Sequence, residues 1–216
     1  LPDDDRLFDY ARRTLVPGIW VNASYRDEGQ SRSTSLSPYV EMKASTRLRA
    51  SLGANINRAD AHTQWYGNFT DADGGTHHAF AHLDQRTVSM NVRVNYTATP
   101  DLTFEFYGEP FTSSGTYSDI REVSPTPEAP AYADRFQPYA PPGDSPTTFS
   151  FRQLRTNAVL RWEYRPGSTL FLVWAHGRQD YAVDQPRRSW QDDFGDLFGL
   201  HPDHTFLVKV SYWLNR

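Results

Sequence analysis

The chain has 216 residues, with 22 Lys and Arg against 26 Asp and Glu, and it contains no cysteine. A net charge of -4 gives no basic footprint for nucleic acid, and the lack of thiols excludes disulfides and thiolate metal sites. Hydrophobic residues make up only 38%, whereas aromatic residues reach 14%. No run of about 18 consecutive apolar residues is present, so transmembrane helices are excluded while membrane-spanning strands are not.

We interpret residues 1–18 as a separate amino-terminal segment. The spacing of Leu7, Ala11 and Leu15 is compatible with a short helix, which the proline and glycine at the end of the segment would terminate. The chain starts at Leu1 with no charged and apolar signal segment, so we expect a processed or partial chain.

Residues 19–216 are predicted to be all-β, with about eight strands in antiparallel succession. Apolar and polar residues alternate most clearly in residues 48–57 and 88–96, which places them on opposite faces of a strand. Residues 148–178 predict a hairpin around the turn Arg165-Pro166-Gly167-Ser168. The alternation is lost in residues 112–147, which are rich in Pro and Ser, and in residues 179–204, so we expect long loops there.

Three features favour an antiparallel up-and-down transmembrane β-barrel, whole or as the carboxy-terminal part of a larger one. Expected connections alternate between short and long, which gathers the short turns at one rim as in outer-membrane barrels. The apolar sets last about ten residues, the length of a tilted membrane strand. They end near the short turns in aromatic residues suited to a bilayer interface. This interface aromatic rim consists of Tyr96, Trp162, Tyr164, Tyr212 and Trp213.

The same alternation also fits a soluble antiparallel β-barrel binding module with the apolar face inside, which stays as the alternative. In a membrane barrel the opposite face would line the lumen. Its charged residues are Arg47, Arg49, Arg93, Glu105, Arg161, Glu163 and Lys209. We interpret these charges as solvating the interior, with a selectivity role as the alternative if the lumen is open. Arg93 is expected to pair across strands with Glu105, near Arg161.

Three segments carry a family resemblance: RTNAVLRWEYRPGSTLFLVW, TFLVKVSYWL and VNYTATPDLTFEFYGEPFTSSGTYSD. They resemble the carboxy-terminal part of a family of large bacterial outer-membrane proteins of undefined function. Members of that family join an amino-terminal carbohydrate-binding module of the family-nine type to a carboxy-terminal barrel. The resemblance covers residues 88–214 and implies an outer-membrane barrel with a connection to carbohydrate. The chain departs from the family by carrying no such module and by ending in Leu214-Asn215-Arg216 after its last aromatic residues.

Candidate chemical groups are scattered along the chain. They are His77, His78, His82 and Asp84, then His176 and Asp180, and finally His201, Asp203 and His204. Acid–base or metal chemistry requires such groups to converge in space, and their spacing does not show convergence. We therefore predict no enzyme, no metal site and no cofactor, with a membrane hydrolase as a third interpretation.

The two expected long loops carry exposed aromatic candidates. These are Tyr117, Tyr132, Phe136, Tyr139, Trp190, Phe194 and Phe198. They either bind a protein partner or a saccharide or pack together as a cap. The sequence thus predicts a passive structural, anchoring or transport role in the bacterial outer membrane, with lipid as the main partner and no nucleic acid.

Overall fold

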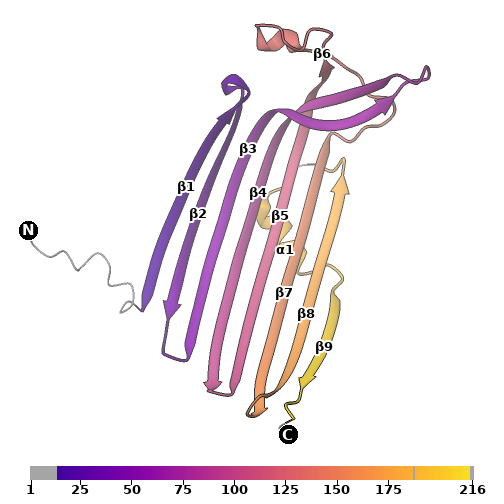
Figure 1. The fold of residues 1–216 in the computed structure, drawn as a ribbon. Helices are drawn as coiled ribbons and strands as arrows, with labels where there is room; N and C mark the ends of the chain where they lie inside the picture. Colours follow the sequence, from indigo (N-terminus) through magenta and orange to yellow (C-terminus); the bar gives the residue numbers. More distant parts are fainter. Residues whose placement is uncertain (1–13, 187, 215–216) are drawn as a thin grey trace, which may run out of the picture.

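The computed structural model describes residues 14–186 and 188–214. These residues form one antiparallel sheet of nine strands in the order β1-β2-β3-β4-β5-β7-β8-β9, with the short strand β6 paired to β5 (Figure 1). The strands are β1 (Leu15–Arg26), β2 (Ser31–Lys43), β3 (Leu48–Thr70), β4 (Thr76–Thr99), β5 (Leu102–Val123), β6 (Phe136–Pro138), β7 (Thr148–Arg165), β8 (Ser168–Val183) and β9 (Asp203–Ser211). The helix α1 (Trp190–Leu197) precedes β9, and 3-10 turns occupy Asp27–Gly29 and Tyr132–Arg135.

Two faces can be followed across the sheet because neighbouring strands keep a nearly unbroken register. Between β3 and β4, Leu52 lies opposite Val92, and Ser51 lies opposite Arg93. Successive side chains of a strand point to opposite faces. We call the face with Leu52 and Val92 face A, and the face with Ser51 and Arg93 face B. The apolar sets predicted in residues 48–57 and 88–96 therefore share face A, as the alternation indicated.

The two faces exchange character halfway along the strands. In the lower half, near the short turns at the bottom of Figure 1, face A is apolar and face B is polar. In the upper half, face A carries Arg32, Arg58, Asp60, His82, Asp84, Arg86, Arg152, Arg178 and Asp180. The upper half of face B carries Leu83, Phe111, Tyr117, Phe149, Phe151 and Tyr181. Polar and apolar residues therefore alternate along the whole length of these strands, but the face that carries the apolar residues changes halfway.

Buried side chains gather in the upper half. Ala79 and Ala81 of β4 have no exposed surface, and Leu83 is almost fully buried. The helix α1 lies behind the sheet in Figure 1, contacts β5 and β7, and buries Leu197. The hydrophobic stabilisation available within the described residues is therefore concentrated in the upper half of the sheet. It lies above the apolar lower half of face A, which we call the apolar band.

The lower half of face A is open. Ile19 of β1 is 63% exposed and Val208 of β9 is 66% exposed, although both are apolar. Within residues 14–186 and 188–214, no element covers this part of the sheet. Exposed apolar surfaces of this extent are uncommon on monomeric soluble proteins.

The sheet is open, so the described residues do not close a barrel by themselves, which corrects the expectation of a whole barrel. Among the described residues, β1 pairs only with β2 and β9 only with β8, and the two strands lie at opposite sides of the sheet in Figure 1. Closure requires the first and last strands to pair. The up-and-down antiparallel order itself agrees with the prediction.

Connection lengths differ from the expected strict alternation. The turns at residues 44–47, 100–101 and 166–167 are short, as expected. The connection at residues 27–30 is short as well, and so is the one at residues 71–75, where β3 and β4 extend far beyond their apolar parts. The upper end of the sheet therefore differs from the lower end in its long strand extensions and two long connections, and not in long loops alone.

Several expected boundaries also shift. β5 continues to Val123 and β6 interrupts the loop expected at residues 112–147. β8 and β9 shorten the loop expected at residues 179–204, which contains α1. β1 begins at Leu15, inside the segment expected at residues 1–18, and most of the expected helix lies outside the described residues.

Candidate functional site

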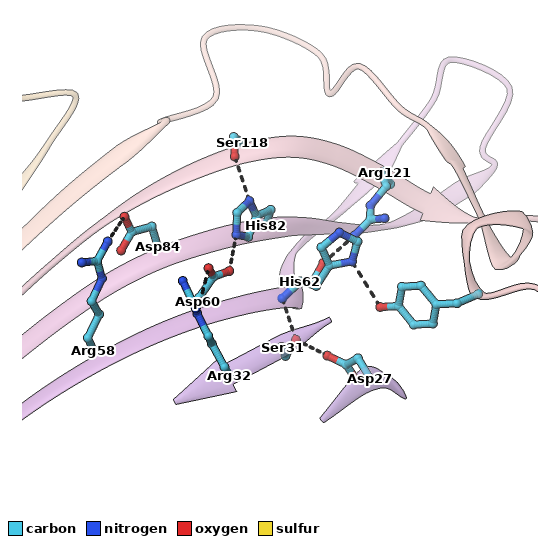
Figure 2. Close-up of polar contacts among 11 residues, drawn as sticks. Asp27, Ser31, Arg32, Arg58, Asp60, His62, His82, Asp84, Ser118 and Arg121 are labelled. Atoms are coloured by element: carbon cyan, nitrogen blue, oxygen red, sulfur yellow. Dashed lines mark hydrogen bonds and ion pairs between the residues drawn. The ribbon is translucent and has the colours of Figure 1, made fainter. Parts of the chain in front are cut away.

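A polar cluster crosses β2, β3, β4 and β5 in the upper half of the sheet (Figure 2). The strand register assembles it, because Arg32 lies opposite Asp60, Asp60 opposite Asp84, and His82 opposite Ser118. These side chains project from face A, where the same strands are apolar lower down. The cluster therefore lies on the same face as the apolar band, but its side chains are polar or charged.

Arginines accompany both carboxylates. Arg32 Nε lies 3.7 Å from Asp60 Oδ2, and Arg58 Nη2 lies 3.6 Å from Asp84 Oδ2. Both guanidinium groups are largely exposed, so each pair contributes at most about 1 kcal/mol. Their arrangement leaves Asp60 Oδ1 available for another partner.

That partner is His82, which lies between a carboxylate and a hydroxyl. Its Nε2 atom is 2.5 Å from Asp60 Oδ1, and its Nδ1 atom is 3.4 Å from Ser118 Oγ. The Asp60 bond places the ring proton on Nε2 and leaves Nδ1 as an acceptor for the serine hydroxyl. Asp60, His82 and Ser118 thus form a chain of hydrogen bonds across three adjacent strands.

His62 lies beside this chain. Its ring centroid is 5.8 Å from that of His82, and Arg121 Nη2 lies 3.0 Å from its Nδ1 atom. Burial and the charge of Arg121 lower the pKa of His62. Its backbone N–H donates to Ser31 Oγ, and its ring meets the hydroxyl of Tyr132 at 3.4 Å.

Ser118 stands at a β-bulge. The register between β4 and β5 shifts between Phe80 and His82, so two residues of β5 lie opposite one residue of β4. The first of these, Asp119, has a φ of 49°, and its carboxylate lies 3.3 Å from Arg121 Nε. Such bulges redirect side chains, and Ser118 is exposed here.

Comparison with known families shows to which family the chain belongs. Residues 9–215 match the family described as a domain of unknown function (DUF5916). The chain belongs to the DUF5916 family. No curated protein and no solved structure matches it. Because the family description gives no function, the outer-membrane and carbohydrate associations of the resemblance remain predictions.

In this DUF5916 chain, the charged residues predicted to face a lumen share face B. Those within strands are Arg49, Arg93, Glu105, Arg161, Glu163 and Lys209. Arg47 lies in the turn before β3, where its Nη1 atom is 3.5 Å from the carbonyl oxygen of Ala98.

The expected ion pairs across strands are replaced by other contacts. Arg93 lies 4.8 Å above the ring of Tyr107, and it lines a hollow of face B together with Glu105. Arg161 pairs with Glu163 along β7 at 2.9 Å. The sequence predicted a shared face, but side-chain length and rotamer decide which partner is reached.

The predicted rim aromatics gather at the end of the sheet with the short turns. Trp162 and Tyr164 are ring neighbours at 6.1 Å. Arg165 Nη1 donates to the Tyr212 hydroxyl at 2.6 Å, and the Trp213 N–H donates to Ser168 Oγ at 2.9 Å. The remaining rim residue, Tyr96, lies opposite Leu48 and Phe104.

The other histidines singled out from the sequence make separate contacts. His77 meets Glu122 at 2.6 Å, His78 meets Asn68 at 2.9 Å, and His176 meets Thr156 at 3.0 Å. Asp84 and Asp180 pair with arginines, and His204 Nδ1 accepts from Trp174 at 3.1 Å. Of the predicted groups, His82 is the one that joins Asp60 and Ser118.

Sequence reasoning missed Asp60, Ser118, His62 and Arg121. One signal was available for Asp60, because the face A alternation of residues 48–56 continues through Arg58 to this position. The register that places Ser118 opposite His82 cannot be read from the sequence of either strand alone.

The aromatic residues expected in loops mostly pack on strand ends. The ring of Tyr139 stacks on His77 at 4.9 Å, and Tyr132 lies 5.6 Å from Phe136. Tyr117 belongs to β5, Trp190 and Phe194 belong to α1, and Phe198 is exposed.

Within the described parts of the chain, no group of three or more His, Cys, Asp or Glu side chains is placed to hold a metal ion. No helix among the residues described has both the length and the apolar character needed to cross a membrane.

Proposed function

We propose that this domain forms part of the wall of a bacterial outer-membrane β-barrel, with a passive structural, anchoring or transport role. The main support for the proposal is that face A is apolar in the lower half of the sheet and charged in the upper half. In a water-soluble barrel, one face would form the core along the whole strand. Here face A is apolar at Leu52 and Val92 but charged at Asp60 and Asp84, which suits strands that leave a bilayer partway along their length.

Strand dimensions support this interpretation. β3 has 23 residues and spans about 75 Å. Its apolar stretch at residues 48–56 spans about 30 Å, close to the 9–11 residues of a tilted membrane strand. The upper half would then project into water, where charges on the outer surface carry no desolvation cost.

The short-turn end of the proposed membrane band has suitable chemistry. The rim residues at the short turns present rings and polar tips, as in the contact of Tyr212 with Arg165, and such side chains favour the bilayer interface. The open edges of β1 and β9 would have to be paired in lipid. We therefore expect further strands to complete the barrel.

A link to carbohydrate is a second part of the proposal. It rests on the resemblance to proteins with a carbohydrate-binding module and on exposed aromatic rings near the upper end, such as Tyr181 and Phe198. Aromatic rings of this kind would offer a stacking surface for a saccharide or a protein partner.

The test uses the lack of cysteine in these 216 residues, so that a cysteine introduced here is the single labelling site within them. Val92→Cys, Arg93→Cys and Arg58→Cys variants of the full-length protein carry a fluorophore in liposomes of brominated lipid. We expect strong quenching at position 92 and little at positions 93 and 58. Equal quenching at 92 and 93, or extraction of the native protein without detergent, would favour the soluble binding barrel with face A as its core.

A further inference from the structure

We propose that Asp60, His82 and Ser118 form a site that hydrolyses carboxylic esters, with Ser118 as the nucleophile. Figure 2 shows the three side chains in line across β3, β4 and β5. The inference goes beyond a passive role in a barrel wall, and it departs from the sequence-based expectation of no enzyme.

The geometry supplies a nucleophile, a base and an orienting carboxylate. Asp60 Oδ1 lies 2.5 Å from His82 Nε2, and Ser118 Oγ lies 3.4 Å from Nδ1. Serine hydrolases on unrelated folds use the same three roles in different chain orders. Contacts between nucleophile and base are often long without substrate and shorten when it binds.

The backbone around Ser118 supports the assignment. Ser118 is exposed and precedes Asp119, whose φ of 49° is uncommon for a residue other than glycine. Ser118 is the direct register partner of His82, which brings the hydroxyl to the ring of the neighbouring strand, and the bulge begins at the next residue of β5. Strained residues at bulges are enriched next to active sites.

The surroundings allow His82 to take up a proton. His62 is the nearest other titratable ring, and the guanidinium of Arg121 donates to its Nδ1 atom at 3.0 Å. A ring nitrogen that accepts a hydrogen bond belongs to a neutral imidazole. His62 therefore places no like charge beside His82, while Asp60 stabilises the imidazolium. His62 and Arg121 act here as positioning residues.

The reaction proceeds in two balanced steps. Ser118 Oγ attacks the acyl carbonyl carbon and passes its proton to His82 Nδ1. The bond between the acyl carbon and the alcohol oxygen breaks, the alcohol leaves with that proton, and acyl-Ser118 remains. Water then attacks the acyl group with His82 again as the base, which releases the carboxylic acid and restores Ser118.

The position of the site indicates the substrate class. Asp60 lies on face A four residues past Ile56, about 13 Å along β3, and His82 lies six residues past Val88, about 20 Å along β4. The site is therefore on the same face as the apolar band and on the water side of the headgroups if the proposed membrane role is right. The fitting substrates are acyl esters of lipids. This choice of substrate rests on the proposed function, whereas reaction with a small soluble ester does not.

The experiment uses the full-length protein in detergent micelles, with p-nitrophenyl butyrate as substrate and a fluorophosphonate as covalent probe. A positioned base contributes roughly 10²–10⁴-fold. We therefore expect measurable turnover of this activated ester, and a loss of roughly 10²-fold in Ser118→Ala and His82→Asn. Asp60→Asn should show a smaller loss. His176→Asn is the matched control, because His176 also meets a hydroxyl, that of Thr156 at 3.0 Å.

Mass spectrometry of the labelled wild-type protein gives a readout that does not depend on any variant folding. Phosphonylation at Ser118 is expected. Labelling at another residue, no labelling, or equal hydrolysis by wild type and Ser118→Ala would overturn the proposal. Failure of the lipid-quenching test with Ser118 still labelled would reject the membrane role and the lipid substrate while leaving the ester chemistry in place.

Discussion

At the scale of single residues, Gly115 marks the closest packing on the upper half of face B. A Cβ atom at this position would lie 2.5 Å from Phe149 Cε1 and 2.7 Å from Leu83 Cδ1. Both neighbours belong to the packed upper half of the sheet. We expect Gly115→Ala to lower the free energy of unfolding by about 1–3 kcal/mol, since overpacking forces side chains from their rotamers. Urea titration in micelles measures the change.

Gly177→Ala is the control for this substitution. Gly177 also lies within a strand, but a Cβ atom there would meet nothing within 4 Å. Its effect should stay within about 0.5 kcal/mol. Similar losses in both variants would mean that the strand position, and not the contact with Phe149, causes the effect.

Residue spacing predicted which side chains share a face, but not which ones touch. The alternation placed Arg93 and Glu105 together on face B, yet Arg93 lies over Tyr107 instead. His82 was a candidate from the sequence alone, whereas Asp60 and Ser118 come from other strands. A site formed across three strands depends on the register between them, which cannot be read from local periodicity.

At the scale of elements, β6 and the segment around it are held to the sheet by a histidine. His77 of β4 meets Glu122 Oε2 at 2.6 Å, Glu122 also accepts from Gln137 of β6 at 2.6 Å, and Tyr139 stacks on His77. The hydrogen bond with Glu122 raises the pKa of His77, and that with His77 lowers the pKa of Glu122. The charged pair therefore joins the connection between β5 and β7 to the strand ends.

This attachment should depend on pH in both directions. The raised pKa of His77 means that its contribution is present below the ordinary value of 6.5 and is lost as pH rises through the folded pKa. The lowered pKa of Glu122 means that its contribution is present above 4.5 and is lost as pH falls through its folded pKa. We expect the slowest proteolysis of residues 124–147 between these limits.

Limited proteolysis across a pH series measures the attachment. His77→Gln keeps a hydrogen bond but cannot be charged, so it should remove the change on the alkaline side and leave the rest. A wild-type cleavage rate that does not increase above the folded pKa of His77 would contradict the proposed role of the pair.

The element lengths show why only part of this arrangement could be predicted from the sequence. Alternation located the apolar halves of β3, β4 and β5, which share face A as expected. It did not reveal that the same strands continue to Thr70, back from Thr76 and on to Val123. In these extensions the alternation continues, but polar residues lie on face A, where the lower halves carry apolar residues. The extensions therefore resemble loops in the sequence.

At the scale of the whole molecule, the main feature of the described sheet is its two open edges, β1 and β9. Every described residue of β9 is exposed, and the strand pairs only with β8 among the residues described. In an antiparallel ladder, successive N–H groups point alternately toward one neighbour and the other. An open edge therefore leaves alternate N–H groups of β9 without a backbone partner, and lipid would not supply one.

Hydrogen exchange of the full-length protein in micelles tests whether this edge is closed. If further strands complete a barrel, consecutive residues such as Leu207 and Val208 should exchange equally slowly. The internal standard is β4, which is paired on both sides with β3 and β5. If β9 remains an edge, every second amide of this strand should exchange faster by a factor of roughly 5–10, since one hydrogen bond contributes about 1–1.4 kcal/mol. That alternating pattern would exclude closure at β9 and, with it, the membrane wall that we propose.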